Sequence, residues 1–357
     1  MAATRFFAQN SSMRPLAPKT RDKNRFSRRL RDQDSIVDDL PQDFALAELP
    51  VCWGGQLRHS ASNLKPNPHP DPLLSPQRTA LVVGPEPDFA ATVATILPDW
   101  TIERARDNVA ALTLIESRVF ELILTGESTS GKADVELLRR IRLIRPHTRL
   151  IILTNESTPT DVIASMREHA FSYFSKPLCW TSISEMVRLA AEGPCWDDGI
   201  EVLSATPAWI RLAARCDVKT ADRLLQFFHE IADLPEPEKS NVASAFREML
   251  LNAIEHGGQF DPKQYVEVSY LRARHMVICR VQDPGNGFSL DEVRHAAIAN
   301  PPDDPIRHQS YRDAKGLRPG GFGVLLTRSL VDEVIYSEKG NEVLLVKYAD
   351  SPRQRTA

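Results

Sequence analysis

Two polar residues in the C-terminal half of the chain have the types and the spacing that phosphoryl transfer needs. Glu248 and Asn252 are four residues apart in a helical pattern, so both lie on one face of the helix. A carboxylate can take a proton from an attacking hydroxyl group or water, and an amide oxygen can ligate Mg²⁺. The alternative is an ordinary surface stripe of ion pairs, because this pair alone is a weak signal.

A second segment, DPGNG, follows a predicted strand at residues 276–283. The apolar residues of this strand alternate, so Asp283 at its end is expected to face the apolar side. A buried carboxylate beside glycines can accept a hydrogen bond from a purine amino group. Gly285 and Gly287 would let the backbone approach the base without a Cβ clash. The alternative is an aspartate that only starts a turn, since this composition favours turns.

A third segment, GGFG at residues 320–323, opens a predicted helix at residues 324–330. Clustered glycines at a helix N-terminus leave N–H groups free at the positive end of the dipole, as phosphate sites require. The charged, Pro-containing stretch at residues 288–319 could form a mobile lid over such a site. Arg312, Lys315 and Arg318 could meet phosphates there, although a solvated loop would explain each of them equally well.

The elements that would position these segments lie in residues 198–350. We expect strands at residues 200–204, 208–213, 265–272, 276–283, 333–337 and 342–348, and helices at residues 219–232, 239–256 and 324–330. The helix at residues 239–256 is apolar on most of its surface, which predicts burial. Its polar stripe then needs partners or a wet pocket. The strands at residues 333–337 and 342–348, joined by Lys339, Gly340 and Asn341, are expected to close the sheet as a hairpin.

Residues 78–192 contain short apolar runs that alternate with amphipathic stretches. We expect strands at residues 79–83, 102–105, 121–125, 150–154 and 171–174, and helices at residues 88–97, 107–117, 133–144, 159–169 and 179–190. The runs LVV, LIL and LIIL do not alternate with polar residues, as is typical of strands buried on both faces. Five β/α repeats predict an α/β fold with a doubly wound parallel sheet.

Residues 1–77 are expected to be a disordered basic tail and a Pro-rich linker. Residues 1–31 hold nine Lys and Arg residues and one acid, Asp22. An Arg-rich, acid-poor start also fits a transit peptide, but it lacks the apolar region of a secretory signal. Residues 64–77 are rich in proline and cannot form a regular helix or ladder.

The bulk composition excludes several classes of function. The formal net charge is −3 and hydrophobic residues make up 42% of the chain, so nothing general argues for nucleic-acid binding. No apolar stretch approaches the length of a membrane span. The five cysteines are irregularly spaced and include no metal-binding pattern. We expect reduced cysteines in a cytoplasmic protein.

In their order, the three polar segments resemble the nucleotide pocket of the GHKL (histidine kinase/Hsp90-like) ATPase superfamily. The stretches REMLLNAIEHG, DPGNGF and GGFGVLLTRSLVDEVIY are most similar to the anti-sigma-factor serine kinases of bacterial partner-switching systems. The resemblance implies an α/β sandwich, in which Glu248 is the catalytic base, Asn252 the Mg²⁺ ligand and Asp283 the adenine-binding residue. It also places five glycines in the ATP pocket: Gly285, Gly287, Gly320, Gly321 and Gly323.

Residues 78–192 resemble the receiver domain of response regulators over their whole length. The stretch ELILTGESTSGKADVELLRRIR has the spacing of the third receiver strand, the active-site loop and the third helix. Thr154 and the Lys176-Pro177 pair also fit the receiver pattern, and the resemblance implies a cis bond before Pro177.

This receiver-like segment lacks the residues that accept and hold a phosphoryl group in receivers. Gly126 stands where the phospho-acceptor Asp belongs, and Gly84 and Pro85 stand where the acidic pair belongs. Mg²⁺ needs oxygen ligands at about 2.1 Å. Glu86 and Glu127 are nearby but shifted along the chain, and such a shift at a strand end turns a side chain the other way. We therefore predict a pseudo-receiver that is not phosphorylated.

The combined resemblance implies an ATP- and Mg²⁺-dependent protein serine/threonine kinase with a receiver-like input domain. No dimerisation helix with a phospho-acceptor His is evident upstream. The substrate would be a separate anti-sigma antagonist of the STAS type, and a sigma factor is the other expected partner. No direct nucleic-acid or membrane partner is expected, and a homodimer stays open. Two alternatives remain: a non-catalytic, ATP-gated partner-binding switch that acts as an anti-sigma factor, and a plain ATPase.

Overall fold

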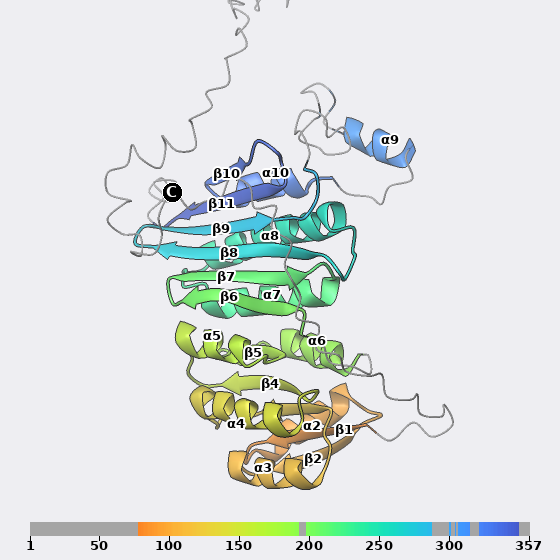
Figure 1. Cartoon of the computed structure of the whole chain (residues 1–357), viewed down its shortest axis with the longest axis vertical. Coiled ribbons are helices and arrows are strands. Elements are labelled where there is room, and N and C mark those ends of the chain that lie inside the picture. Colours follow the sequence, from red (N-terminus) through yellow and green to blue (C-terminus); the bar gives the residue numbers. More distant parts are fainter. Residues whose placement is uncertain are drawn as a thin grey trace, which may run out of the picture. The chain divides into compact units, whose positions relative to one another are not determined.

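The computed structural model describes residues 78–192, 198–287, 300, 304, 306–314 and 321–349. The predicted tail and linker at residues 1–77 and most of the predicted lid at residues 288–319 lie outside the described residues. The described part belongs to one compact unit of the chain, Gly55–Ala357, and it contains two sheets (Figure 1).

The first sheet is parallel, with its five strands in the order β2-β1-β3-β4-β5. The strands are β1 (Thr79–Val83), β2 (Thr101–Ala105), β3 (Leu122–Thr125), β4 (Arg149–Thr154) and β5 (Ser172–Ser175). Every residue of β3 and β4 is buried, as expected for strands that are covered on both faces. The order is that of the flavodoxin-like doubly wound sheets, so the predicted parallel fold is confirmed.

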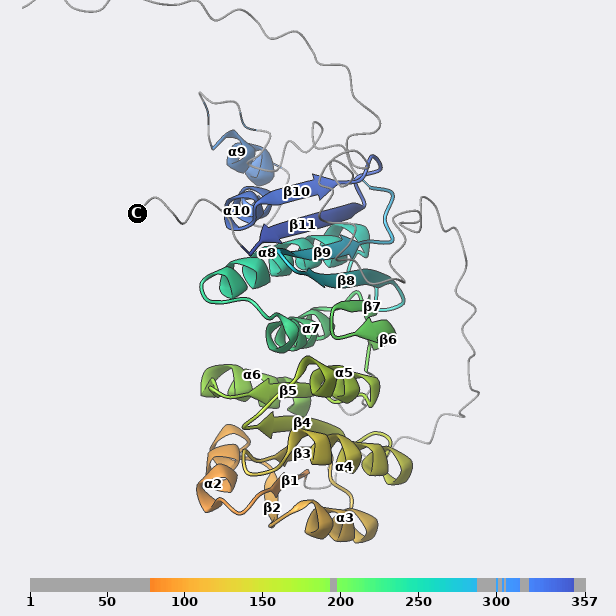
Figure 2. The same ribbon diagram turned by 90° about the vertical axis from the view of Figure 1, so that its left-hand side faces the viewer.

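Helices cover both faces of the parallel sheet (Figure 2). One face carries α2 (Pro87–Ile96) and α6 (Trp180–Ala191), and the other carries α3 (Asn108–Ser117), α4 (Gly131–Ile144) and α5 (Pro159–Arg167). Local capping helps to define the helix starts. The Asp107 side chain accepts a hydrogen bond from the Ala110 N–H at 2.8 Å, and Thr158 and Asp161 form a reciprocal capping box at the start of α5.

The second sheet is antiparallel, with its six strands in the order β10-β11-β9-β8-β7-β6. The strands are β6 (Ile200–Thr206), β7 (Trp209–Arg215), β8 (Tyr265–Ala273), β9 (Met276–Gln282), β10 (Glu333–Tyr336) and β11 (Glu342–Tyr348). The helices α7 (Val218–Ile231), α8 (Glu238–Asn252) and α10 (Gly323–Leu330) lie on one face of this sheet (Figure 2). The predicted α/β sandwich is therefore confirmed.

The structure differs from the sequence-based expectations in two elements. The helix predicted at residues 239–256 is α-helical only to Asn252 and continues as a π-helical turn, η3 (Ala253–Gly257). A further helix, α9 (Arg307–Ala314), lies inside the stretch interpreted as a lid. The cis bond implied before Pro177 is present.

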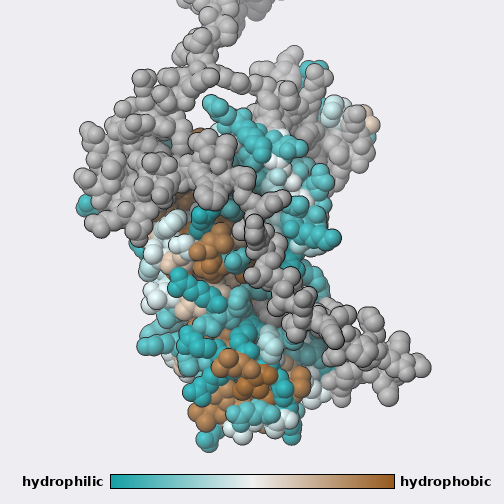
Figure 3. Space-filling view, viewed as in Figure 1, coloured by the Kyte–Doolittle hydropathy of each residue, from teal (hydrophilic) through white to brown (hydrophobic). Residues whose placement is uncertain are grey.

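Hydrophilic side chains cover much of the face shown in Figure 3, and apolar side chains gather there in separate patches. Among the described large apolar residues, Val109, Val119 and Leu143 of the parallel domain are the most exposed. In the described part of the chain, we find no helix with the length and apolar character needed to cross a membrane.

Candidate nucleotide-binding site

The rotation of α8 is fixed by its apolar residues. Phe246, Met249 and Leu250 are at most 3% exposed, so these positions anchor the helix in the core. Glu248 and Asn252 are only half-buried. The predicted polar stripe therefore lies at the accessible side of a helix that is otherwise held firmly in place.

The end of this helical segment meets the strand-end carboxylate. A Cβ on Gly257, at the end of η3, would lie 2.2 Å from Oδ1 and 2.3 Å from Cβ of Asp283. Real Cβ atoms do not approach other atoms so closely, so Asp283 can occupy this place only because residue 257 is glycine. Single π-helical turns are frequent at functional sites. The first and second polar segments are thus in contact.

The third segment meets the first segment at the N-terminus of α10. A Cβ on Gly323 would lie 2.8 Å from Oε2 of Glu248 and 3.6 Å from Nδ2 of Asn252. The start of α10 therefore faces both polar side chains of α8. Gly321 has a φ of +94°, a left-handed conformation that favours glycine. Gly320 lies outside the described residues.

Asp283 is held in place by hydrogen bonds with Gly285 and with Asn341. The Gly285 N–H donates to Oδ1 of Asp283 at 2.8 Å. The main chain of Asp283 exchanges two hydrogen bonds with Asn341, one from its own N–H to the Asn341 carbonyl at 2.9 Å and one from Asn341 Nδ2 at 3.1 Å. Partial burial raises the pKa of the Asp283 carboxyl, and the Gly285 N–H opposes this rise. The carboxylate is therefore fixed in position and partly shielded from water.

The turn between β10 and β11 also fixes the DPGNG loop, which the sequence interpretation missed. Lys339 Nζ donates to the Gly285 carbonyl at 3.0 Å. A Cβ on Gly287, whose φ is +79°, would lie 1.9 Å from the Lys339 carbonyl oxygen. The sequence interpretation assigned Lys339, Gly340 and Asn341 only to a hairpin turn. Nothing in the local sequence signals that this turn reaches a loop more than 50 residues earlier.

The arrangement fits a nucleotide with a hard cation. The absent Cβ of Gly323 leaves room beside Glu248 and Asn252, at a helix N-terminus that favours anions. Mg²⁺ usually keeps several waters and takes one or two protein ligands together with phosphates. The Asn252 amide oxygen is the group that would ligate it. The described residues include no cluster of three or more His, Cys, Asp or Glu side chains suited to a metal ion.

Other residues considered as phosphate contacts cannot be placed in the site. Lys315 and Arg318 lie outside the described residues, and so does the side chain of Arg312 in α9. The described part of α9 does contact the third segment, because the rings of His308 and Phe322 meet edge to face with centroids 4.6 Å apart.

The strand ends of the parallel sheet have no aspartate at the receiver acceptor position. Gly126 follows β3, and its missing Cβ would lie 3.4 Å from Oε2 of Glu86. The Glu86 carboxylate therefore lies against both Gly84 and Gly126. This corrects the expectation that the displacement of Glu86 along the chain turns its side chain away. Lys176 pairs with Glu127 at 2.7 Å. The Thr154 hydroxyl donates to the Glu156 carbonyl at 3.0 Å.

Comparison with known proteins agrees with this arrangement in the C-terminal part. Residues 212–347 match the family described as histidine kinase-like ATPase domain. The serine-protein kinase RsbW of Listeria monocytogenes serotype 4a is 30% identical over 105 residues, 29% of this chain. The match spans 62% of that relative's length. RsbW of Oceanobacillus iheyensis is 24% identical over 153 residues, 42% of this chain and 87% of the relative.

Solved structures similar to this chain include a receiver domain protein and a response regulator. A CheY-like receiver domain protein from Methanospirillum hungatei is 20% identical and covers 33% of this chain and 98% of its own, with a TM-score of 0.28. A response regulator from Thermotoga maritima is 22% identical and covers 33% of this chain and 99% of its own, with a TM-score of 0.30. The strand order of the parallel sheet is the one that flavodoxin and CheY share.

Proposed function

We propose that this chain, in which a histidine kinase-like ATPase domain follows a receiver-like domain, is an ATP-dependent serine/threonine-protein kinase of the anti-sigma-factor type. Its substrate is a separate antagonist protein of the STAS type, and a sigma factor is its second partner. The observation that carries the proposal is the meeting of three separate polar segments around Gly323 and Gly257. The similarity to serine-protein kinases supports it.

Each segment has a distinct part in the proposed reaction. The Asp283 carboxylate accepts a hydrogen bond from the adenine amino group, and the N-terminus of α10 faces the phosphates. The substrate hydroxyl attacks the γ-phosphorus, its proton passes to Glu248, and the bond between the γ-phosphorus and the oxygen of ADP breaks. Asn252 would hold Mg²⁺, which would supply charge neutralisation on the phosphates. Positioning and electrostatic stabilisation account for most of the rate.

The proposed kinase can be tested by transfer of labelled phosphate from ATP to a candidate STAS-domain partner. Glu248→Gln keeps the size of the side chain, so ATP binding should persist while transfer falls by about 10²-fold or more. Asn252→Ala should weaken Mg²⁺-dependent ATP binding. Ser244→Ala is the matched control, because Ser244 lies one turn earlier on α8 and is exposed.

Two results would decide against the kinase. If the wild-type protein transfers no phosphate, yet ATP changes its affinity for a sigma factor, the chain is an ATP-gated switch. If ATP is hydrolysed at the same rate with and without any partner and no protein is labelled, the chain is a plain ATPase. Transfer by Glu248→Gln at the wild-type rate would remove Glu248 from the role of base.

A further inference from the structure

Helix α7 of the ATPase domain packs against β5 of the receiver-like domain. β5 is an edge strand of the parallel sheet, so one row of its backbone groups has no neighbouring strand among the residues that the structure describes. An edge strand of this kind needs other partners for its N–H and C=O groups. Side chains of α7 supply these partners.

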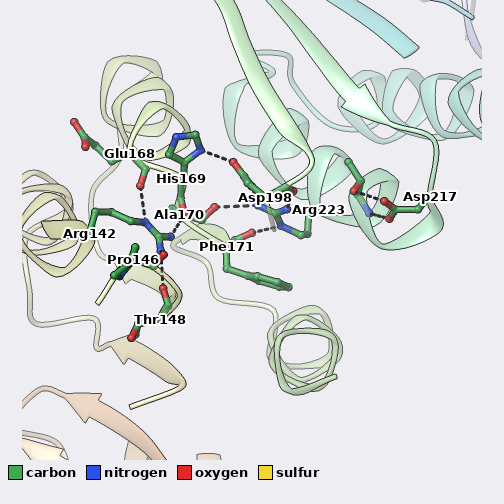
Figure 4. A network of polar contacts seen from close by, with 11 residues as sticks. Arg142, Pro146, Thr148, Glu168, His169, Ala170, Phe171, Asp198, Asp217 and Arg223 are labelled. Carbon is green, nitrogen blue, oxygen red and sulfur yellow. Dashed lines mark hydrogen bonds and ion pairs between the residues drawn. The ribbon is translucent and has the colours of Figure 1, made fainter. Parts of the chain in front are cut away.

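Arg223 of α7 makes the most extensive of these contacts (Figure 4). Its side chain is 3% exposed. Its Nε donates to the Phe171 carbonyl at 2.8 Å and its Nη2 donates to the Ala170 carbonyl at 3.2 Å, just before β5. The guanidinium also binds both the carbonyl and the carboxylate of Asp198, which in turn lies 2.6 Å from His169 Nδ1. A buried cation with this many acceptors fixes the junction between the two domains.

Two further side chains of α7 continue along the strand. Gln226 Nε2 donates to the Tyr173 carbonyl at 3.0 Å. The Glu230 carboxylate accepts from the Ser175 N–H at 3.2 Å and from the Ser175 hydroxyl at 2.5 Å. Arg223, Gln226 and Glu230 are spaced at i, i+3 and i+7, so they share one face of the helix. We call these three residues the edge-binding face of α7.

The side of α7 that is turned away from β5 packs on α8. The rings of Phe228 and Phe246 stack with centroids 4.7 Å apart, and both side chains are at most 5% exposed. Phe246 is two residues before Glu248 in α8. Close-packed cores transmit displacement because they leave little free space. A shift of α7 therefore acts directly on the helix that carries the candidate base.

The apolar core is also continuous across the junction. Val162 and Met166 of α5 belong to the same buried cluster as Leu224 and Phe227 of α7. The two domains are thus joined by a polar row along β5 and by apolar packing beside it.

We propose that the receiver-like domain holds α7 in place through the edge-binding face, and that α7 in turn positions α8. The receiver-like domain is then a structural part of the nucleotide site. This inference rests on the proposed function for what the site binds. It assigns the three α7 residues as positioning residues, since none of them lies among the residues proposed to contact nucleotide. It also predicts that a change at β5 is felt in α8.

Hydrogen exchange of the full chain without nucleotide tests this proposal. Arg223→Met and, from the receiver side, Ser175→Ala each remove contacts along β5. We expect amide exchange in α8, over residues 245–252, to become about tenfold faster in Arg223→Met and about threefold faster in Ser175→Ala. Lys219→Gln is the matched control, because Lys219 also lies on α7 and pairs across the junction with Glu192, but in an exposed position. It should leave α8 unchanged.

The affinity for ATP is the second measurement. It separates a failure of the proposed function from a failure of the proposed coupling between β5 and α8. If the wild-type protein binds ATP, Arg223→Met should weaken binding by about three- to thirtyfold. Glu230→Ala should also weaken ATP binding, and Glu230→Gln, which keeps an acceptor for Ser175, should bind ATP nearly as tightly as the wild type. If the wild-type protein does not bind ATP, the proposed function fails while the exchange data still decide the coupling. Faster exchange confined to β5 and α7 in folded variants, with α8 unchanged, would overturn the inference.

Discussion

Gly323 lies so close to Glu248 that a Cβ on residue 323 would stand 2.8 Å from the carboxylate oxygen Oε2. The two residues are 75 positions apart in the sequence, from Glu248 in α8 to Gly323 at the start of α10. Their proximity joins the helix that carries the candidate base to the helix N-terminus that is suited to phosphate. The nearest atom is the end of the flexible Glu248 side chain, which can move aside, so a methyl group on residue 323 need not disturb the fold.

Gly323→Ala should therefore keep the fold and weaken nucleotide binding. Alanine is favoured over glycine in helices by up to about 1 kcal/mol, so the melting temperature should be unchanged or higher. The added methyl group displaces the Glu248 carboxylate into the space beside Asn252, and the affinity for ATP should fall by about tenfold. Calorimetric titration and thermal unfolding check the two effects. Leu325→Ala, on an exposed position of the same helix, should bind ATP normally. Wild-type affinity in Gly323→Ala would contradict this geometry.

Asp134 should make the stability of the receiver-like domain depend on pH. Its side chain is fully buried, and burial raises its pKa from 3.8 to about 6, against hydrogen bonds from Thr129 and Asn108. The folded protein binds this proton more tightly than the unfolded chain. The stabilising contribution is therefore full below pH 3.8 and is lost as the pH rises through about 6.

Asp134→Asn should remove this loss, because a neutral amide can still bond with Thr129 and Asn108. Relative to the wild type, the variant should gain up to about 3 kcal/mol in free energy of unfolding between pH 4 and pH 7.5. Urea unfolding across this range measures the difference. Asp107→Asn is the control, because the Ala110 N–H lowers the pKa of Asp107 and asparagine preserves the cap. A difference between wild type and Asp134→Asn that stays constant with pH would contradict the assignment.

The receiver-like domain should not accept a phosphoryl group. Gly126 offers no carboxylate at the acceptor position, and Glu86, which reaches the same place, is exposed. We expect acetyl phosphate and beryllofluoride to leave the intact mass and the amide exchange of residues 78–192 unchanged. A stoichiometric gain of one phosphate in this region would show that another carboxylate takes the role.

Much of this fold could be predicted from sequence because its elements have strong local signals. The five parallel strands were predicted to within one residue, and unalternating apolar runs mark β1, β3 and β4. The close approach of Gly257 to Asp283 was not predicted. The hydrogen bonds from Lys339 and Asn341 to the DPGNG segment could not be predicted. They depend on which turn the antiparallel sheet brings beside this segment. The π-helical turn at Ala253–Gly257 also has no local sequence signal.

The contacts between the two domains could not be predicted from the sequence either. Arg223 is a charged residue in an amphipathic helix, and charged residues are almost never fully buried unless they are paired. Its partners include two backbone carbonyls of the other domain, those of Ala170 and Phe171. Backbone groups have no side-chain identity, so no pattern of residue types marks them.

The affinity of the full chain for ATP with Mg²⁺, compared between wild type and Asp283→Asn, tests the central claim most directly. The substitution keeps the shape of the side chain that fits against Gly257 and Gly285, but it replaces an acceptor with an amide that mispairs with the adenine amino group. The wild type should bind ATP, and Asp283→Asn should bind it more weakly by about 1–3 kcal/mol, with an unchanged melting temperature without nucleotide. Equal affinity of the two proteins for ATP would contradict the assignment of this pocket.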